Sequence, residues 1–142
     1  MIIAYINSLI LFLISAIHIY WGVGGKWGLM AALPEHNNTK VLRPGPVATF
    51  IVAVILGCMA LFYLYKINEL AIFNSFNLPW LDQYGLWFLA GVFLLRAIGD
   101  FRYVGFFKQV YGSRFAYLDS RFYSPLCLLL SINTFLLIAF LK

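Results

Sequence analysis

Charged residues are scarce in this sequence, and their scarcity decides its class. Of 142 residues, 11% are Asp, Glu, Lys or Arg, whereas 63% are hydrophobic and 19% are aromatic. A soluble domain contains about 25% charged residues, so this chain has too few to cover an apolar core. With a mean hydropathy of +0.89, we expect lipid to surround most of it. A soluble enzyme, a nucleic-acid-binding module and a disordered tail are therefore excluded.

Three further features are missing. The N-terminal apolar run has no basic residue before it and no small-x-small cleavage site, so we interpret it as a membrane helix and not as a signal peptide. The two cysteines, Cys58 and Cys127, lie at different expected depths, so we predict small buried hydrophobic residues and no disulfide. His18 has no second ligand three or four residues away, and we predict no metal site and no cofactor.

Four runs are long and apolar enough to cross the hydrocarbon core, which takes about 20 residues in a helix. They span residues 2–24, 46–65, 84–101 and 125–141. Pro46 and Pro125 suit the first helical turn, and Ser124 is an expected N-cap. Runs this continuous are too apolar for the alternating strands of a membrane barrel. The sequence predicts an all-α fold, a four-transmembrane-helix bundle that forms a single membrane domain over residues 1–142.

Basic residues are distributed unevenly between the loops. Seven lie in the first and third loops: Lys26, Lys40, Arg43, Arg102, Lys108, Arg114 and Arg121. The second loop and the C-terminus carry one each, Lys66 and Lys142. Because short basic loops stay in the cytoplasm, we expect both termini outside and a multi-pass protein of the bacterial inner membrane.

The second loop, residues 66–83, is not simply polar. Its apolar residues are interrupted by Asn, Glu and Asp, which is typical of a segment lying on the membrane surface. Trp80 and Tyr84 suit the aromatic belt at the headgroup level. We therefore predict a short interfacial segment in the outer loop, with a folded external binding loop as the alternative.

One face of the first span is small and polar. Asn7, Ser8, Ser15, His18 and Gly22 fall within about a 100° arc of a helix. Small residues let helices approach closely, so packing against other spans accounts for Ser8, Ser15 and Gly22. An imidazole brings no such close approach. His18 is therefore either an interhelical hydrogen-bonding residue or part of a binding or proton-handling site.

The third span contains two charged residues. Arg96 and Asp100 are four positions apart on one expected helix face, and Tyr103 continues the stripe. A charge at the bilayer centre costs about 2.5–3.5 kcal/mol on insertion scales. One interpretation is an internal ion pair that neutralises itself and locks the bundle. Another is an arginine held by the aspartate to receive an anionic group. The third is an Arg96 that snorkels toward the headgroups without a partner.

In the predicted topology the polar residues converge at one depth. His18, Arg96 and Asp100 lie toward the cytoplasmic ends of their spans, and Asp119 and Arg121 precede the fourth span at the same level. The outer half of the bundle carries no charge. We therefore predict a polar pocket that opens to the cytoplasm, covered by the glycine-rich loop 22–28. The candidate ligand-binding residues are His18, Trp21, Lys26, Trp27, Arg96, Asp100, Tyr103, Asp119 and Arg121.

Three stretches form a recognisable combination: Ser15 to Gly28, Gly99 to Lys108, and Asp119 to Cys127. Together they resemble an uncharacterised family of small bacterial four-helix membrane proteins, over essentially the whole chain. The resemblance implies the same fold and the same location. It supplies no activity and no cofactor that could be transferred to these residues.

Three functions remain open. The first is binding of a small anion or lipid headgroup, or a transport-accessory role, which four short helices would fill as a homo-oligomer or with a larger membrane partner. The second is a structural or assembly subunit whose polar cluster only stabilises the fold. The third is a membrane enzyme acting on a lipid-like substrate, with His18 as acid or base and Asp100 or Asp119 orienting it. The sequence has no recognised nucleophile motif, so we favour the first function and do not expect an enzyme or a nucleic-acid partner.

Overall fold

The protein is built from four long helices. Its structure, a computed structural model, describes residues 1–36, 39–40, 44–67 and 79–141. The helices are α1 (Ile2–Gly22), α3 (Pro46–Lys66), α4 (Pro79–Ile98) and a continuous fourth made of α5 (Arg114–Leu118), the π-helical turn η2 (Asp119–Tyr123) and α6 (Ser124–Leu141). All four are long and apolar enough to cross a membrane. The all-α, four-span prediction is confirmed.

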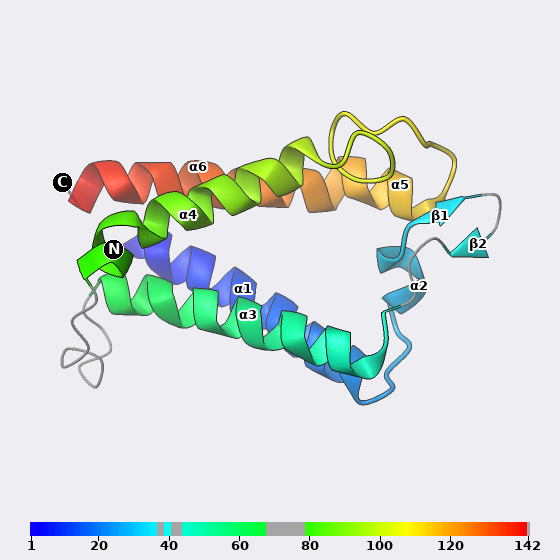
Figure 1. Ribbon diagram of the computed structural model, residues 1–142, viewed down its shortest axis with the longest axis horizontal. Coiled ribbons are helices and arrows are strands. Elements are labelled where there is room, and N and C mark those ends of the chain that lie inside the picture. Colours follow the sequence, from blue (N-terminus) through cyan, green and yellow to red (C-terminus); the bar gives the residue numbers. More distant parts are fainter. Residues whose placement is uncertain (37–38, 41–43, 68–78, 142) are drawn as a thin grey trace.

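The helices pack as two pairs. α1 lies along α3, and α4 lies along α6, while the pairs contact each other mainly through α1 and α6. Both termini lie at one end of the bundle, which we call the terminus end (Figure 1). At the other end, the loop end, lie α2 (Leu29–Ala32) and the short antiparallel strands β1 (Glu35–His36) and β2 (Thr39–Lys40). The two pairs diverge toward the loop end (Figure 1).

A neutral polar network joins the helix pairs in the terminus half. The Asn7 side chain donates to Thr134 Oγ1 at 3.3 Å and accepts a hydrogen bond from Asn133 Nδ2 at 3.0 Å. The Tyr63 hydroxyl also bonds Thr134 Oγ1, so the network links α1, α3 and α6. Asn7, Tyr63 and Thr134 are fully buried. Every member is uncharged, which suits hydrogen bonding between helices inside a lipid environment.

The small polar face of α1 packs as predicted. Ser8 Oγ donates to the Ala60 carbonyl at 2.9 Å and Ser15 Oγ to the Ala53 carbonyl at 2.7 Å, both on α3. A Cβ added at Gly22 would lie 2.9 Å from the ring of Phe50. These close approaches hold α1 and α3 together along their length.

The third span differs from its predicted bounds of 84–101. α4 begins five residues earlier, at Pro79, so Trp80 and Tyr84 are exposed residues of its first turns. It ends at Ile98 because Gly99 adopts a φ of +90°, a conformation that favours glycine. Of the predicted interfacial segment, residues 68–78 lie outside the described part of the chain.

The fourth helix starts eleven residues before its predicted first residue, Pro125, and Ser124 does not cap it. Ser113 is the N-cap, and its Oγ accepts a hydrogen bond from the Ala116 N–H at 3.0 Å. Ser124 has helical dihedral angles, and its N–H bonds the Asp119 carbonyl five residues back. Because Pro125 has no N–H and its ring would crowd the preceding turn, this wider π turn lets the helix continue.

The cysteines are both free. Cys127 is partly buried, in agreement with a small hydrophobic role, but Cys58 is exposed on α3. The prediction of burial for Cys58 is wrong because α3 packs with one side on α1 and leaves its other side to lipid.

Candidate functional site

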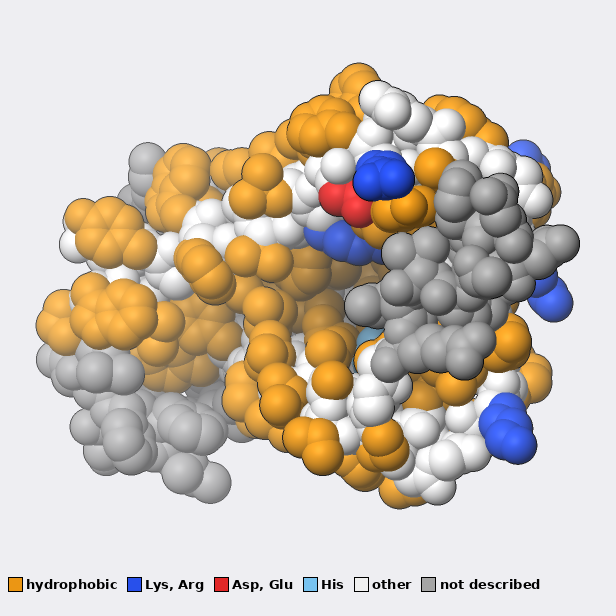
Figure 2. Space-filling view, turned by 45° about the vertical axis from the view of Figure 1, so that its right-hand side comes forward, with side chains coloured by type: hydrophobic (Ala, Val, Ile, Leu, Met, Phe, Trp, Pro, Cys, Tyr) orange, Lys and Arg blue, Asp and Glu red, His pale blue; other side chains and the backbone are white. Residues whose placement is uncertain are grey.

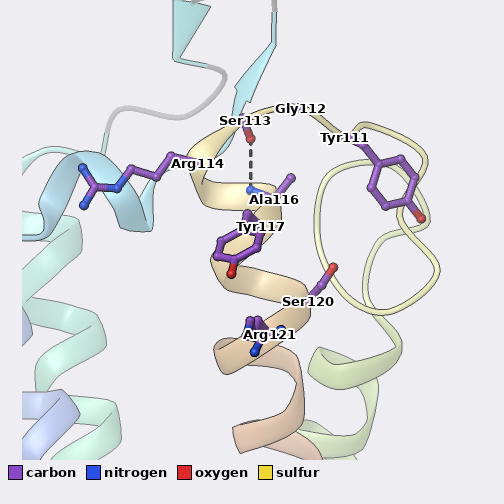
Figure 3. A pocket seen from close by; sticks show the side chains of 8 residues that line it. All are labelled: Tyr111, Gly112, Ser113, Arg114, Ala116, Tyr117, Ser120 and Arg121. Carbon is purple, nitrogen blue, oxygen red and sulfur yellow. Dashed lines mark hydrogen bonds between the residues drawn. The ribbon is translucent and has the colours of Figure 1, made fainter.

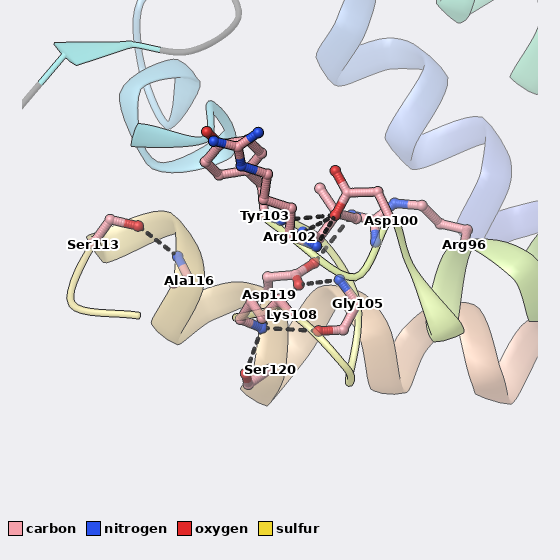
Figure 4. Close-up of polar contacts among 11 residues, drawn as sticks. Arg96, Asp100, Arg102, Tyr103, Gly105, Lys108, Ser113, Ala116, Asp119 and Ser120 are labelled. Atoms are coloured by element: carbon pink, nitrogen blue, oxygen red, sulfur yellow. Dashed lines mark hydrogen bonds and ion pairs between the residues drawn. The ribbon is translucent and has the colours of Figure 1, made fainter. Parts of the chain in front are cut away.

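Asp119, the first residue of the π turn, is the centre of a charged cluster at the loop end (Figure 4). Its side chain is fully buried. Oδ1 accepts a hydrogen bond from Arg96 Nη2 at 3.1 Å. Oδ2 accepts from Lys108 Nζ at 3.0 Å and from the Gly105 N–H at 2.7 Å. One carboxylate therefore joins α4, the loop after it and the fourth helix.

Lys108 is as buried as the carboxylate it pairs with. Besides Asp119, its Nζ donates to Ser120 Oγ at 2.6 Å and to the Gly105 carbonyl at 3.1 Å. These three bonds use all three donors of an ammonium group. Lys108 is thus fully satisfied within the protein. In the sequence analysis Lys108 was only one of the basic loop residues. Its position directly after two phenylalanines was the one sequence feature that could have indicated burial.

A tight loop aims these groups at Asp119. Asp100 Oδ1 accepts hydrogen bonds from the N–H groups of Arg102, Tyr103 and Val104 at 2.7–2.9 Å. Desolvation opposes ionisation of Asp100, but these backbone hydrogen bonds outweigh it and hold its pKa below the usual value. Gly105 has a φ of +93° and lies against the backbone at Ile98, where an added Cβ would collide with the Ile98 carbonyl.

The structure resolves the partner of Arg96. The predicted i, i+4 pairing with Asp100 requires both residues on one helix, and α4 ends at Ile98. Asp100 instead accepts hydrogen bonds from the backbone of its own loop, and Arg96 forms an ion pair with Asp119 on the fourth helix. An interhelical ion pair therefore replaces the intrahelical one.

Two buried polar atoms near this cluster have no hydrogen-bond partner in the described part of the chain: Arg96 Nη1 and Ser124 Oγ. Their levels match. Ser131 Oγ donates to the Ala90 carbonyl at 2.9 Å, which fixes the register between α6 and α4. The two helices run antiparallel, so counting two turns back along α6 from Ser131 and two turns forward along α4 from Ala90 reaches the same level. Ser124 therefore lies level with residues 96 and 97.

On α1, His18 and Trp21 form a second group. His18 Nδ1 donates to the Ile14 carbonyl at 2.8 Å, since a carbonyl can only accept, and a neutral ring then has its lone pair on Nε2. The ring meets Trp21 edge to face with centroids 5.0 Å apart. Trp21 Nε1 donates to the Trp27 carbonyl at 2.8 Å, which ties down the loop after α1. Figure 2 shows a hollow between the helix pairs, with a histidine side chain inside and charged side chains on its rim.

The remaining predicted residues lie further out. Lys26 and Trp27 are exposed on the loop after α1. The Arg102 guanidinium covers the ring of Tyr103 at 5.2 Å. Arg121 is exposed and lines a groove on the outer face of α5 and η2. Within the described residues, no group of three His, Cys, Asp or Glu side chains could hold a metal ion.

Comparison with known proteins places this chain in a family. A family model described as a protein of unknown function, DUF3995, matches residues 11–134. The chain belongs to this family. The resemblance drawn from the sequence motifs is thereby confirmed, and the match includes the whole Arg96–Lys108–Asp119 cluster. No curated protein and no solved structure matches. Membership of the DUF3995 family brings no activity with it, so function has to be argued from the site.

Proposed function

We propose that the loop end binds a small anionic group between α4 and α6, with Arg96 and Ser124 as its direct hydrogen-bond donors. The observation that carries this proposal is the pair of buried atoms, Arg96 Nη1 and Ser124 Oγ, that lack partners at one level of the same helix pair. A buried donor without a partner costs about 1–3 kcal/mol. Two of them at the same level of one helix pair suit a site where one ligand oxygen or anion satisfies both.

Charge supports an anion as the ligand. The cluster contains two cations, Arg96 and Lys108, against the single carboxylate of Asp119. Lys108 has no donor left, because all three of its hydrogen bonds are internal. Arg96 is therefore the cation available to a ligand, and its side chain is 35% exposed. Asp119 holds the guanidinium in place, so the donor is oriented before the anion arrives.

The ligand class is an anionic oxygen group, either the phosphate of a lipid headgroup or a free anion. We place the site on the cytoplasmic side, with both termini outside, in a bacterial inner membrane. The support is the concentration of basic residues at the loop end, among them Lys26, Arg102 and Arg121. His18 and Trp21 on α1 are proposed as further contacts for a ligand larger than a single anion.

Native mass spectrometry tests this proposal. The protein is released from a mild detergent, first as purified and then after addition of inorganic phosphate or of phosphatidylglycerol. We expect folded Arg96→Gln and Ser124→Ala to carry one bound anion or lipid fewer than the wild type. Ser131→Ala is the matched control, since that serine is equally buried on α6 but donates to Ala90. If the wild type binds only phosphate, the ligand is a free anion. If it binds only phosphatidylglycerol, the ligand is a lipid headgroup.

A bare mass in every sample, with no phosphate or lipid adduct on the wild type, would contradict the proposal. Equal loss from Ser131→Ala would also contradict it, because loosened packing would then suffice. In the structural alternative, Arg96→Gln lowers the melting temperature while the ligand-bound fraction of all variants is unchanged.

In the enzyme hypothesis, Asp100 or Asp119 would orient His18, but both carboxylates have other partners. Asp119 accepts hydrogen bonds from Arg96, Lys108 and the Gly105 N–H. Asp100 accepts from the backbone of its own loop. His18 is held by a backbone carbonyl instead of a carboxylate. No observation in the described residues favours acid–base chemistry over binding.

A further inference from the structure

A basic groove lies on the exposed face of α5 and η2, apart from the site between α4 and α6. Its volume is about 850 Å³. Figure 3 shows the side chains around it, which include those of Tyr111, Ser113, Arg114, Tyr117, Ser120 and Arg121. None of the described residues that line it is acidic. Among them the groove therefore has two guanidinium groups and no carboxylate.

The serines of this groove are arranged to donate. Ser120 Oγ accepts a hydrogen bond from Lys108 Nζ at 2.6 Å, so its own proton is left for another acceptor. Ser113 Oγ likewise accepts from the Ala116 N–H at 3.0 Å. Together with Arg114 and Arg121, the groove offers donors of two kinds and a positive field. Phosphate oxygens, which only accept, are the matching chemistry.

Helix length places this groove at the headgroups. The fourth helix has 28 residues, or about 42 Å at a rise of about 1.5 Å per residue, whereas the hydrocarbon core is about 30 Å thick. Counting about 20 residues back from Leu141 reaches Phe122. Arg114 to Arg121 then extend beyond the hydrocarbon. Phe107 and Phe122 nearby are 63% and 60% exposed, which suits immersion at the interface.

We propose that this groove binds one anionic glycerophospholipid, with its phosphate between Arg114 and Arg121 and its acyl chains beside Phe122. The charge selects an anionic headgroup, and the described lining offers no carboxylate as a partner for the amine of a zwitterionic one. The interfacial depth and the exposed aromatic side chains select a lipid over a soluble phosphate. The site uses neither Arg96 nor Ser124, so it stands or falls separately from the proposed function.

Lipid titration followed by native mass spectrometry tests the groove. Delipidated protein in a neutral detergent is titrated with dioleoylphosphatidylglycerol or dioleoylphosphatidylcholine, and soluble glycerol 3-phosphate serves as the chain-free probe. We expect wild type to prefer phosphatidylglycerol. Arg114→Gln and Arg121→Gln should each weaken that preference about fivefold, and the double variant about 25-fold. Arg102→Gln removes an exposed guanidinium outside the groove and should leave the preference unchanged.

Charge-preserving substitutions separate recognition from simple attraction. Arg114→Lys with Arg121→Lys keeps the net charge but loses the forked donors, and should retain part of the preference. Equal binding of both lipids by wild type would overturn the proposal. So would an Arg102→Gln effect as large as that of Arg121→Gln, because any surface cation would then be equivalent. Glycerol 3-phosphate binding as tightly as the lipid would overturn the acyl-chain contact.

Discussion

The buried polar side chains at the two ends of the bundle are satisfied in different ways. At the terminus end, Asn7, Tyr63 and Thr134 are buried and uncharged, and they satisfy one another across three helices. At the loop end, Lys108 and Asp119 are buried and charged, and Asp119 also pairs with Arg96, which joins α4 to the fourth helix. The neutral network lies where the helix pairs meet, and the charged cluster lies where they diverge (Figure 1).

The difference follows from the cost of charge in lipid. A charged side chain at the bilayer centre costs about 2.5–3.5 kcal/mol on insertion scales, and less near the headgroups. Neutral hydrogen bonds between membrane helices contribute only about 0.6 kcal/mol on average. A neutral network is therefore suited to joining helices at depth. A charged cluster is tolerated near the surface, and its excess positive charge makes that end the one able to attract a ligand.

The largest expected effect is loss of the carboxylate at the loop end. Asp119→Asn leaves the fully buried Lys108 without its counter-charge, and we expect a loss of about 3–5 kcal/mol of unfolding free energy. Denaturant unfolding in detergent measures it. Adding Lys108→Met should recover most of the loss, because no buried charge is then left unpaired in the loop. If the double variant is no more stable than Asp119→Asn, the ion pair is not the cause.

The next effect concerns the loop that serves the charged cluster. Gly105→Ala would bring a Cβ against the Ile98 carbonyl, whereas Gly112→Ala meets open space at a similar φ of +95°. Both alanines are strained by the positive φ, so this strain cancels in the comparison. We expect Gly105→Ala to be less stable than Gly112→Ala by about 1–3 kcal/mol, the cost of overpacking. Thermal unfolding of the two variants side by side measures the difference. Equal melting temperatures would show that the loop has another conformation.

A smaller effect is expected at the neutral network. Thr134→Val keeps the shape but removes the hydroxyl shared by Asn7 and Tyr63. We expect a loss of about 1 kcal/mol, and no change in anion or lipid adducts in native mass spectra. A loss as large as that of Asp119→Asn would remove the contrast between the two ends. A change in bound ligand would show that the ends are coupled.

The smallest effect is a pH dependence from Asp100. Its pKa is lower in the folded protein than the usual value of 3.8, since backbone hydrogen bonds outweigh desolvation. Its contribution to stability is therefore fully present above the unfolded pKa and is lost as the pH falls through the folded one. Asp100→Asn can still accept hydrogen bonds but cannot titrate. Melting curves between about pH 6 and about pH 3 should show a slightly steeper loss for wild type than for this variant.

Local patterns accounted for the spans and for part of the site. The four apolar runs and Pro46 at the start of α3 were predictable because each depends on neighbours along the chain. The helical period also showed that Ser8 and Ser15 share a packing face, but not that their partners lie on α3. The end of α4 was misplaced, since the i, i+4 spacing of Arg96 and Asp100 indicated a helix that continues past Gly99, where the chain instead turns with a φ of +90°. The start of the fourth helix was misplaced too, because Pro125 looked like a beginning where a π turn carries the helix through.

The sequence by itself determined that this chain forms four membrane-length helices, and that most of its basic residues gather at one end. Both follow from the transfer of residues into lipid, which depends on composition along a short run. Only the tertiary structure decided that Arg96 pairs with Asp119, that Lys108 is buried beside it, and that Ser124 lies level with the free nitrogen of Arg96. These contacts join residues from separate segments, whose register is set by helix packing and by the turn at Gly99.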